Sequence, residues 1–129
     1  MKRFISICTL LLCFMLALPA QERKVKLKIV QTSDVHGNYY PYNFITQTEW
    51  GGSLARIYAL VQKERETYKD NLILLDNGDI LQGQPTAYYY NYIDTVSPHL
   101  CAEMMNYMKY DAGNMGNHDV ETGRGVFDR

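Results

Sequence analysis

The stretch Gln31 to Tyr42, QTSDVHGNYYPY, begins where the first predicted strand of the chain ends. That strand is RKVKLKIVQ, residues 23–31, in which lysines on a predicted solvent-facing side alternate with aliphatic residues at a period of two. Asp34 and His36 are two residues apart, so both side chains are expected to point to one place beyond the strand end. Gly37 then lets the chain turn away. An oxygen and a nitrogen ligand together suit Zn, Mn or Fe, although an Asx-turn beside a hydrogen-bonded histidine is the alternative.

The rest of the chain is predicted to alternate helices and strands. Apolar residues at helical spacing predict helices over residues 51–68 and 97–110, with Ser53 and Ser97 as N-caps. Pro85 favours a further helix over 84–93, with a strand as the alternative. The short apolar run of residues 71–79 predicts a buried strand, and 111–119 a weak short strand that runs into a loop.

This alternation predicts an α/β fold with a parallel-rich sheet and packed helices. Ligands of such sheets bind at the carboxyl ends of the strands. Two more polar motifs are expected at that edge. Asp79 follows Gly78 after the second strand, and its carboxylate has the two oxygens needed to bridge two metal ions about 3.5–4 Å apart. Ordinary Asn-Gly-Asp turn chemistry is the alternative.

The third motif is GNHD, residues 116–119. Asn117 offers a neutral carbonyl ligand, and His118 is suited to donate a proton or a hydrogen bond to developing negative charge. Asp119 is placed to orient the His118 ring, and a polar loop without chemistry is the alternative. His99, in contrast, is predicted to lie on the surface at a helix start.

The motifs D-x-H, G-D and G-N-H-D, in this order, resemble those of the calcineurin-like metallophosphoesterases. The segments TSDVHGNYYPY, GGSLAR, ILLDNGDILQGQP and YDAGNMGNHDVETG more closely resemble the exported nucleotidase branch of that superfamily. This branch hydrolyses nucleoside 5′-monophosphates and 2′,3′-cyclic nucleotides. The resemblance runs from Leu27 to about Gly123.

The resemblance implies the first half of a four-layer α/β/β/α domain and a small-molecule phosphate ester, a nucleotide, as substrate. It implies two divalent metal ions of Zn, Mn or Fe, held by Asp34, His36, Asp79 and Asn117. It further implies that Asp79 would bridge the two ions and that a hydroxide held between them would attack phosphorus. His118 serves as acid or transition-state stabiliser, with Asp119 as its partner.

The sequence also departs from this pattern. The further histidines that complete both metal shells, and the domain that holds the nucleoside, are not found among the 129 residues. Residues 21–129 are therefore expected to be the N-terminal part of the domain and inactive alone, without the C-terminal half. Two alternatives stay open: a non-catalytic remnant or interaction module, and a hydrolase of another ester, such as a nucleotide sugar or a sulfur ester.

Residues 1–20 are predicted to be a signal peptide, because a basic start precedes an apolar run without charge. The run is shorter than the roughly 20 residues of a membrane-spanning helix. We expect export to the periplasm or the extracellular space, with no stable membrane anchor after cleavage. The formal net charge of −1 gives no sign of a nucleic-acid duplex as partner.

Overall fold

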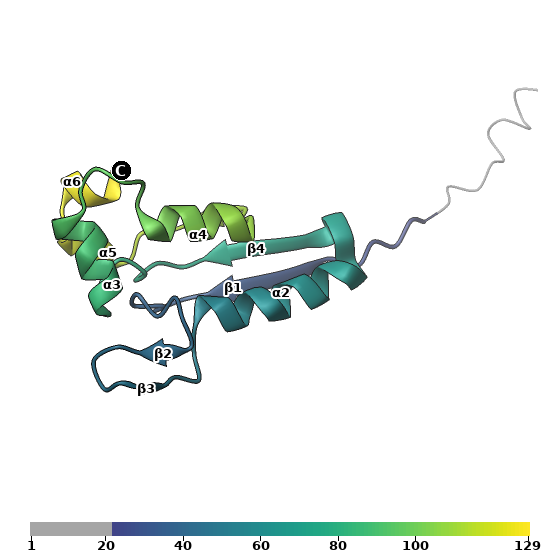
Figure 1. The fold of residues 1–129 in the computed structure, drawn as a ribbon. Coiled ribbons are helices and arrows are strands. Elements are labelled where there is room, and N and C mark those ends of the chain that lie inside the picture. Colours follow the sequence, from purple (N-terminus) through teal and green to yellow (C-terminus); the bar gives the residue numbers. More distant parts are fainter. Residues whose placement is uncertain (1–21) are drawn as a thin grey trace, which may run out of the picture.

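The computed structural model describes residues 22–129, so the predicted signal peptide lies outside the described part (Figure 1). The strands are β1 (Lys28–Thr32), β2 (Tyr42–Asn43), β3 (Thr48–Glu49), β4 (Leu72–Asp76) and β5 (Ala112–Gly113). The helices are α2 (Leu54–Tyr68), α3 (Pro85–Tyr88), α4 (Leu100–Met108), α5 (Asn117–Glu121) and α6 (Arg124–Phe127). A 3-10 turn η1 (Lys69–Asn71) precedes β4, and a π-helical turn η2 (Tyr89–Ile93) follows α3. Within residues 22–129 we find no helix with the length and apolarity that crossing a membrane requires.

The main sheet has the order β1-β4-β5, and all its strands are parallel. Thr32 at the end of β1 pairs with Asp76 at the end of β4, which in turn pairs with Gly113 of β5. The three carboxyl ends are therefore level. β2 and β3 form a separate antiparallel hairpin. The structure confirms the predicted α/β class and is consistent with the first half of the family domain.

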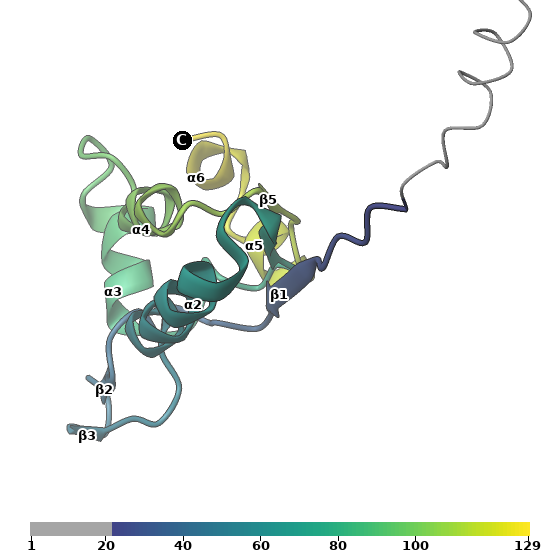
Figure 2. The ribbon, with the colours of Figure 1, turned by 90° about the vertical axis from the view of Figure 1, so that its right-hand side faces the viewer.

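Helices α2 and α4 lie on the same face of the sheet (Figure 2). The core between them and β4 is apolar, and it includes Leu54, Val61, Leu72, Leu74, Cys101 and Met108. On the opposite face no helix among the described residues covers the sheet, and Ile29 is 58% exposed. The predicted orientation of β1 is therefore wrong. Lys28 is half-buried toward α2, where it pairs with Glu64 at 3.1 Å, and Val30 packs against the core on the same face, whereas Ile29 faces the uncovered side.

Two helix starts differ in how well the sequence predicted them. Ser53 caps α2 as expected, because its Oγ accepts the N–H of Arg56 at 3.3 Å. Ser97 does not cap α4. Its N–H instead donates to the Asp94 carboxylate at 3.0 Å, which holds the preceding turn out of the helix, and His99 is the cap.

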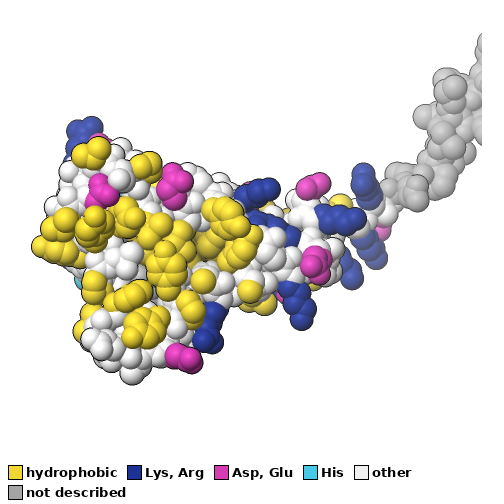
Figure 3. Space-filling model, viewed as in Figure 1, with side chains coloured by type: hydrophobic (Ala, Val, Ile, Leu, Met, Phe, Trp, Pro, Cys, Tyr) yellow, Lys and Arg dark blue, Asp and Glu magenta, His cyan; other side chains and the backbone are white. Residues whose placement is uncertain are grey.

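Exposed aromatic residues gather on one part of the surface. In Figure 3 hydrophobic side chains spread over the half of the molecule that carries α3, α4 and the β2–β3 hairpin. Lysine and arginine side chains gather at the other end. Residues 85–93 are helical, as predicted for this segment. Tyr88 and Tyr92 are 58% and 48% exposed, and their ring centroids lie 5.1 Å apart.

Candidate metal centre

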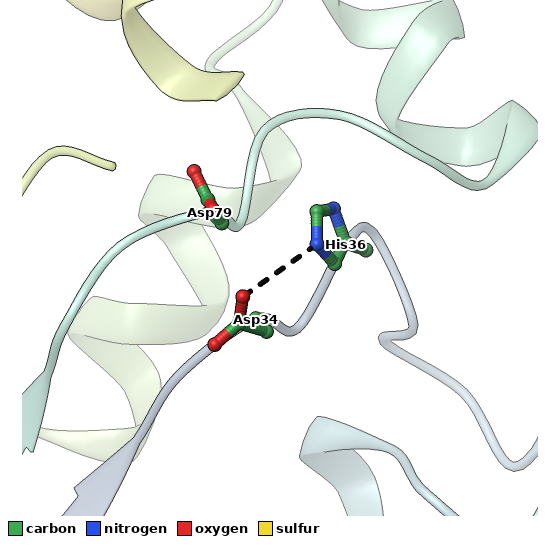
Figure 4. Close-up of side chains that lie close together, drawn as sticks. All are labelled: Asp34, His36 and Asp79. Atoms are coloured by element: carbon green, nitrogen blue, oxygen red, sulfur yellow. Dashed lines mark ion pairs between the residues drawn. The ribbon is translucent and has the colours of Figure 1, made fainter. Parts of the chain in front are cut away.

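Asp34, His36 and Asp79 come together at the carboxyl edge of the sheet (Figure 4). One potential ligand atom from each side chain lies within 4.8 Å of the other two. His36 Nε2 is 3.9 Å from Asp34 Oδ1. Asp34 and His36 follow β1 and Asp79 follows β4, so the convergence is a direct result of pairing these two strands in parallel.

Backbone hydrogen bonds join the two loops that carry these residues. The N–H of Asp34 donates to the Gly78 carbonyl at 3.0 Å, and the N–H of His36 donates to the Asp79 carbonyl at 2.8 Å. The carbonyl of His36 accepts from Gln84 at 3.1 Å. The ligand side chains therefore project from a short, paired backbone segment that continues beyond the strands.

All three candidate ligands have a left-handed backbone. The φ angles are +55° for Asp34, +49° for His36 and +60° for Asp79. This region costs an L-residue roughly 1–2 kcal/mol, less for aspartate. Such conformations persist only where the surrounding structure imposes them, and they concentrate at functional sites. Here the surrounding structure is the paired loop backbone.

Two glycines allow the close approach of these loops. A Cβ atom on Gly83 would collide with the backbone of His36. A Cβ atom on Gly116 would collide with Asp79. The turn that starts α5 therefore packs directly against the Asp79 carboxylate.

Asp119 supports the loop rather than the His118 ring. Its side chain is 1% exposed. Oδ1 accepts the N–H groups of Ile80 and Leu81 at 2.9 and 2.8 Å, and Oδ2 accepts those of Asp79 and Gly116 at 2.7 and 2.9 Å. These four bonds use the acceptor sites of the carboxylate. The predicted pairing of Asp119 with the ring of His118 is therefore corrected.

His118 lies beside the triad. Its ring centroid is 5.4 Å from that of His36, and its backbone N–H donates to Asp79 Oδ1 at 2.9 Å. Its ring nitrogen Nδ1 is 2.9 Å from the carboxylate of Glu121. This hydrogen bond raises the pKa of His118, against a smaller opposing effect of desolvation.

The sequence interpretation missed Glu121 because it read GNHD as a loop. The segment instead begins α5, with Gly116 as N-cap, so residues three apart lie on one face. The helix brings the side chains of His118 and Glu121 together, and a loop would not predict this pairing. Asn117 is the exposed first residue of α5, next to His118, and its role as a ligand stays a prediction.

Gln82 was also missed. Its carbonyl is 3.2 Å from His36 Nδ1, and its side-chain amide is 3.4 Å from Glu121. When the carbonyl accepts a hydrogen bond from Nδ1–H, Nε2 carries the free lone pair and points toward Asp34. This is the tautomer that metal binding through Nε2 requires. A backbone carbonyl leaves no sequence signal, so only the structure identifies it.

The Calcineurin-like phosphoesterase family model matches residues 27–129. The chain belongs to this family. Calcineurin-like phosphoesterases use divalent metal ions, and Asp34, His36 and Asp79 are a candidate ligand group for them. Relatives of this chain are named as 5′-nucleotidases and cyclic-nucleotide phosphodiesterases.

Among these calcineurin-like relatives, the trifunctional nucleotide phosphoesterase protein YfkN of Bacillus subtilis is 38% identical over 81% of this chain. The 2′,3′-cyclic-nucleotide 2′-phosphodiesterase/3′-nucleotidase of Salmonella typhimurium is 32% identical over 88% of it. The crystal structure of YfkN matches with a TM-score of 0.75 and 35% identity over 82% of this chain.

The chain spans only a small part of these calcineurin-like relatives. It covers 8% of the YfkN sequence, 18% of the Salmonella protein and 34% of the YfkN chain in the crystal structure. The matched part is the N-terminal part of these relatives.

Proposed function

We propose that the protein is a metal-dependent phosphoesterase that hydrolyses nucleotides. The observation that carries the proposal is the convergence of Asp34, His36 and Asp79 within 4.8 Å, with the His118 ring 5.4 Å from that of His36. An oxygen and nitrogen donor set of this kind fits Zn, Mn or Fe. The chain thus combines metal ligands with an adjacent group that can transfer a proton.

Three groups of this chain would hold the first divalent ion: Asp34, His36 and Asp79. Asp79 Oδ1 accepts the His118 amide at 2.9 Å, and within residues 22–129 the second oxygen accepts no hydrogen bond, so it would be available to a metal ion. Asn117 is the proposed ligand of the second ion. When bound, two such ions activate a water molecule and offset negative charge on the phosphoryl group.

His118 is the proposed general acid. Glu121 holds Nδ1 and favours the protonated ring, since its carboxylate raises the pKa of His118. Nε2 is then the atom that donates to the leaving oxygen of the ester. The usual contribution of such proton transfer is about 10²–10⁴ in rate.

The substrate proposed is a nucleoside 5′-monophosphate or a 2′,3′-cyclic nucleotide, which the names of the relatives support. The test is hydrolysis by the whole protein of AMP, 3′-AMP, 2′,3′-cyclic AMP, UDP-glucose and p-nitrophenyl phosphate, with Mn²⁺, Zn²⁺ or EDTA. Metal-dependent turnover of a nucleotide supports the proposal. Preference for UDP-glucose would move the substrate class to nucleotide sugars, and no turnover with any metal would favour a non-catalytic module.

His118→Asn tests the division of roles in the same assay. We expect it to retain metal binding and to lose about 10²–10⁴ in turnover. His118 is half-buried and lies outside the hydrophobic core, so its ring can be changed without disturbing the core. If His118→Asn instead loses metal and keeps normal turnover after reconstitution, the residue is a ligand and not the acid.

We also propose that the protein is exported and cleaved after the predicted signal peptide. The apolar run between Phe4 and Ala20 supports this. Expression in a bacterium followed by N-terminal sequencing of the protein outside the cytoplasm should give a start near Gln21. Recovery of intact Met1 from the cytosol alone would contradict export.

A further inference from the structure

A buried chain of hydrogen bonds leads from the first turn of α4 toward the metal centre. His99 is 3% exposed, which corrects its predicted surface position. Its Nδ1 is 3.1 Å from the donating N–H of Cys101, and its Nε2 is 2.8 Å from Asn91 Oδ1. Because Nδ1 accepts a hydrogen bond from the backbone N–H of Cys101, the ring proton resides on Nε2, which donates a hydrogen bond to Asn91 Oδ1.

Asn91 continues this chain to the loop that follows β4. It is 4% exposed and lies in the π-helical turn η2, a local departure from α-helix that often occurs at functional sites. Its Nδ2 donates to the carbonyl of Leu81 at 2.6 Å. The N–H of the same Leu81 donates to Asp119 at 2.8 Å, so the peptide groups on both sides of Leu81 are fixed.

The loop of residues 79–82 serves two candidate ligands. It carries Asp79, and the carbonyl of Gln82 is 3.2 Å from His36 Nδ1. Leu81 lies between them and is the point at which Asn91 holds the loop. A shift of Leu81 would therefore move one ligand and release the orientation of the other.

We propose that His99 and Asn91 are positioning residues that hold the loop of residues 79–82 in its metal-binding geometry. The inference rests on the proposed function, because it concerns the same centre. Within the described part of the chain, neither side chain forms a hydrogen bond with a candidate ligand; their partners are Leu81, Cys101 and each other. They act through Leu81, as hydrogen-bonded groups behind metal ligands do when they fix ligand orientation.

The chain of bonds is sensitive to acid. Protonation of Nδ1 removes the acceptor of the Cys101 N–H. Burial lowers the pKa of His99, and the positive charge of Arg129 lowers it further. The Tyr90 ring lies 5.8 Å from the His99 ring, while Arg129 and Asp119 line the same cavity of about 170 Å³ as His99.

The sign of the pH effect follows from this lowered pKa. The folded protein favours neutral His99, so this stabilisation is complete above the usual histidine pKa of about 6.5 and declines as the pH falls below it. Cys101 does not titrate in this window, because burial raises its pKa to about 12.

Two variants separate positioning from simple helix capping. His99→Asn keeps a good N-cap for α4 but is too short to reach Asn91. Asn91→Ala removes the bond to Leu81. In the whole protein we expect each to weaken Mn²⁺ binding by about 10- to 100-fold in calorimetry. Asn43→Ala is the matched control, since Asn43 is also buried and bonds only to the backbone of the β2–β3 hairpin.

Hydrogen exchange of the metal-free protein supplies a second measurement that does not depend on activity. We expect the Leu81 amide to exchange faster in both variants, and in the unaltered protein to exchange faster at pH 5 than at pH 7 relative to its intrinsic rate. The inference would be overturned if His99→Asn and Asn91→Ala bind Mn²⁺ within twofold of the unaltered protein. It would also be overturned if Asn43→Ala loses as much Mn²⁺ affinity as these two variants. If the unaltered protein binds no Mn²⁺, the proposed function fails, and unchanged exchange at Leu81 would then overturn the positioning role.

Discussion

Strand β4 and the loop of residues 77–84 that follows it are stabilised in opposite ways. In β4, Leu72 and Leu74 are 7% and 0% exposed beneath the helices, and the backbone pairs with β1. In the loop, the buried carboxylate of Asp119 binds three consecutive backbone N–H groups from Asp79 to Leu81. Apolar burial therefore maintains the sheet, and a buried charge with fixed hydrogen bonds maintains the site beside it.

The largest expected effect belongs to the loop. Asp79→Ala should reduce metal-dependent hydrolysis to the detection limit and should also remove metal binding, because both ions of the proposed centre would depend on this carboxylate. Calorimetry with Mn²⁺ and an AMP hydrolysis assay would measure both. Asp128→Ala is the control, since it removes an exposed carboxylate that pairs with Arg124 on α6. Retained turnover in Asp79→Ala would contradict the assignment of the site.

The next effect belongs to the strand. Leu74→Ala should lower the free energy of unfolding by about 2–5 kcal/mol, the usual cost of a large cavity in a core. Ile29→Ala, on the uncovered face of the same sheet, should change it by less than about 0.5 kcal/mol. Urea denaturation of the metal-free protein measures the difference. If both variants lower the free energy of unfolding equally, Ile29 must be buried in solution by a part of the protein outside residues 22–129 or by another molecule.

Asp119→Asn tests whether the loop depends on charge and hydrogen bonding rather than on packing. The amide group would face two N–H donors, and leaving a buried donor unpaired costs about 1–3 kcal/mol. Unlike Leu74→Ala, this variant should also weaken Mn²⁺ binding by the folded protein. Loss of stability with unchanged Mn²⁺ affinity would separate the loop from the site and contradict the comparison.

The smallest expected effect concerns the His118–Glu121 pair. Glu121 raises the pKa of His118, so the protonated ring persists to higher pH than it would alone. Glu121→Gln should therefore lower the His118 pKa, and the ring should lose its proton at a lower pH. NMR titration of the metal-free protein follows the ring directly. An unchanged titration would show that the two side chains do not pair in solution.

The sequence predicted the elements whose signals are local. The strand through Leu72 to Asp76 and the helix capped by Ser53 needed only short-range patterns, and the structure contains both. The convergence of Asp34, His36 and Asp79 followed from parallel strand order. This part of the candidate site was therefore accessible before any coordinates.

The remaining features depend on contacts between distant residues. Which face of β1 is covered depends on α2, and the alternation of lysines alone pointed to the wrong one. Asp119 acts on the backbone N–H groups of the loop after β4, which are 38 to 40 residues away in the sequence. His99 acts through Asn91 in the preceding turn η2. Acceptors for backbone N–H groups leave no spacing pattern, so sequence reasoning assigned Asp119 to its adjacent histidine.

The left-handed backbone at Asp34, His36 and Asp79 has an evolutionary consequence. Glycine would adopt these φ angles without steric cost, so selection for folding alone would favour its gain at such positions. A gene released from catalysis would be free to drift in that direction. Two carboxylates and an imidazole at these three strained positions are therefore residues for which folding alone does not account.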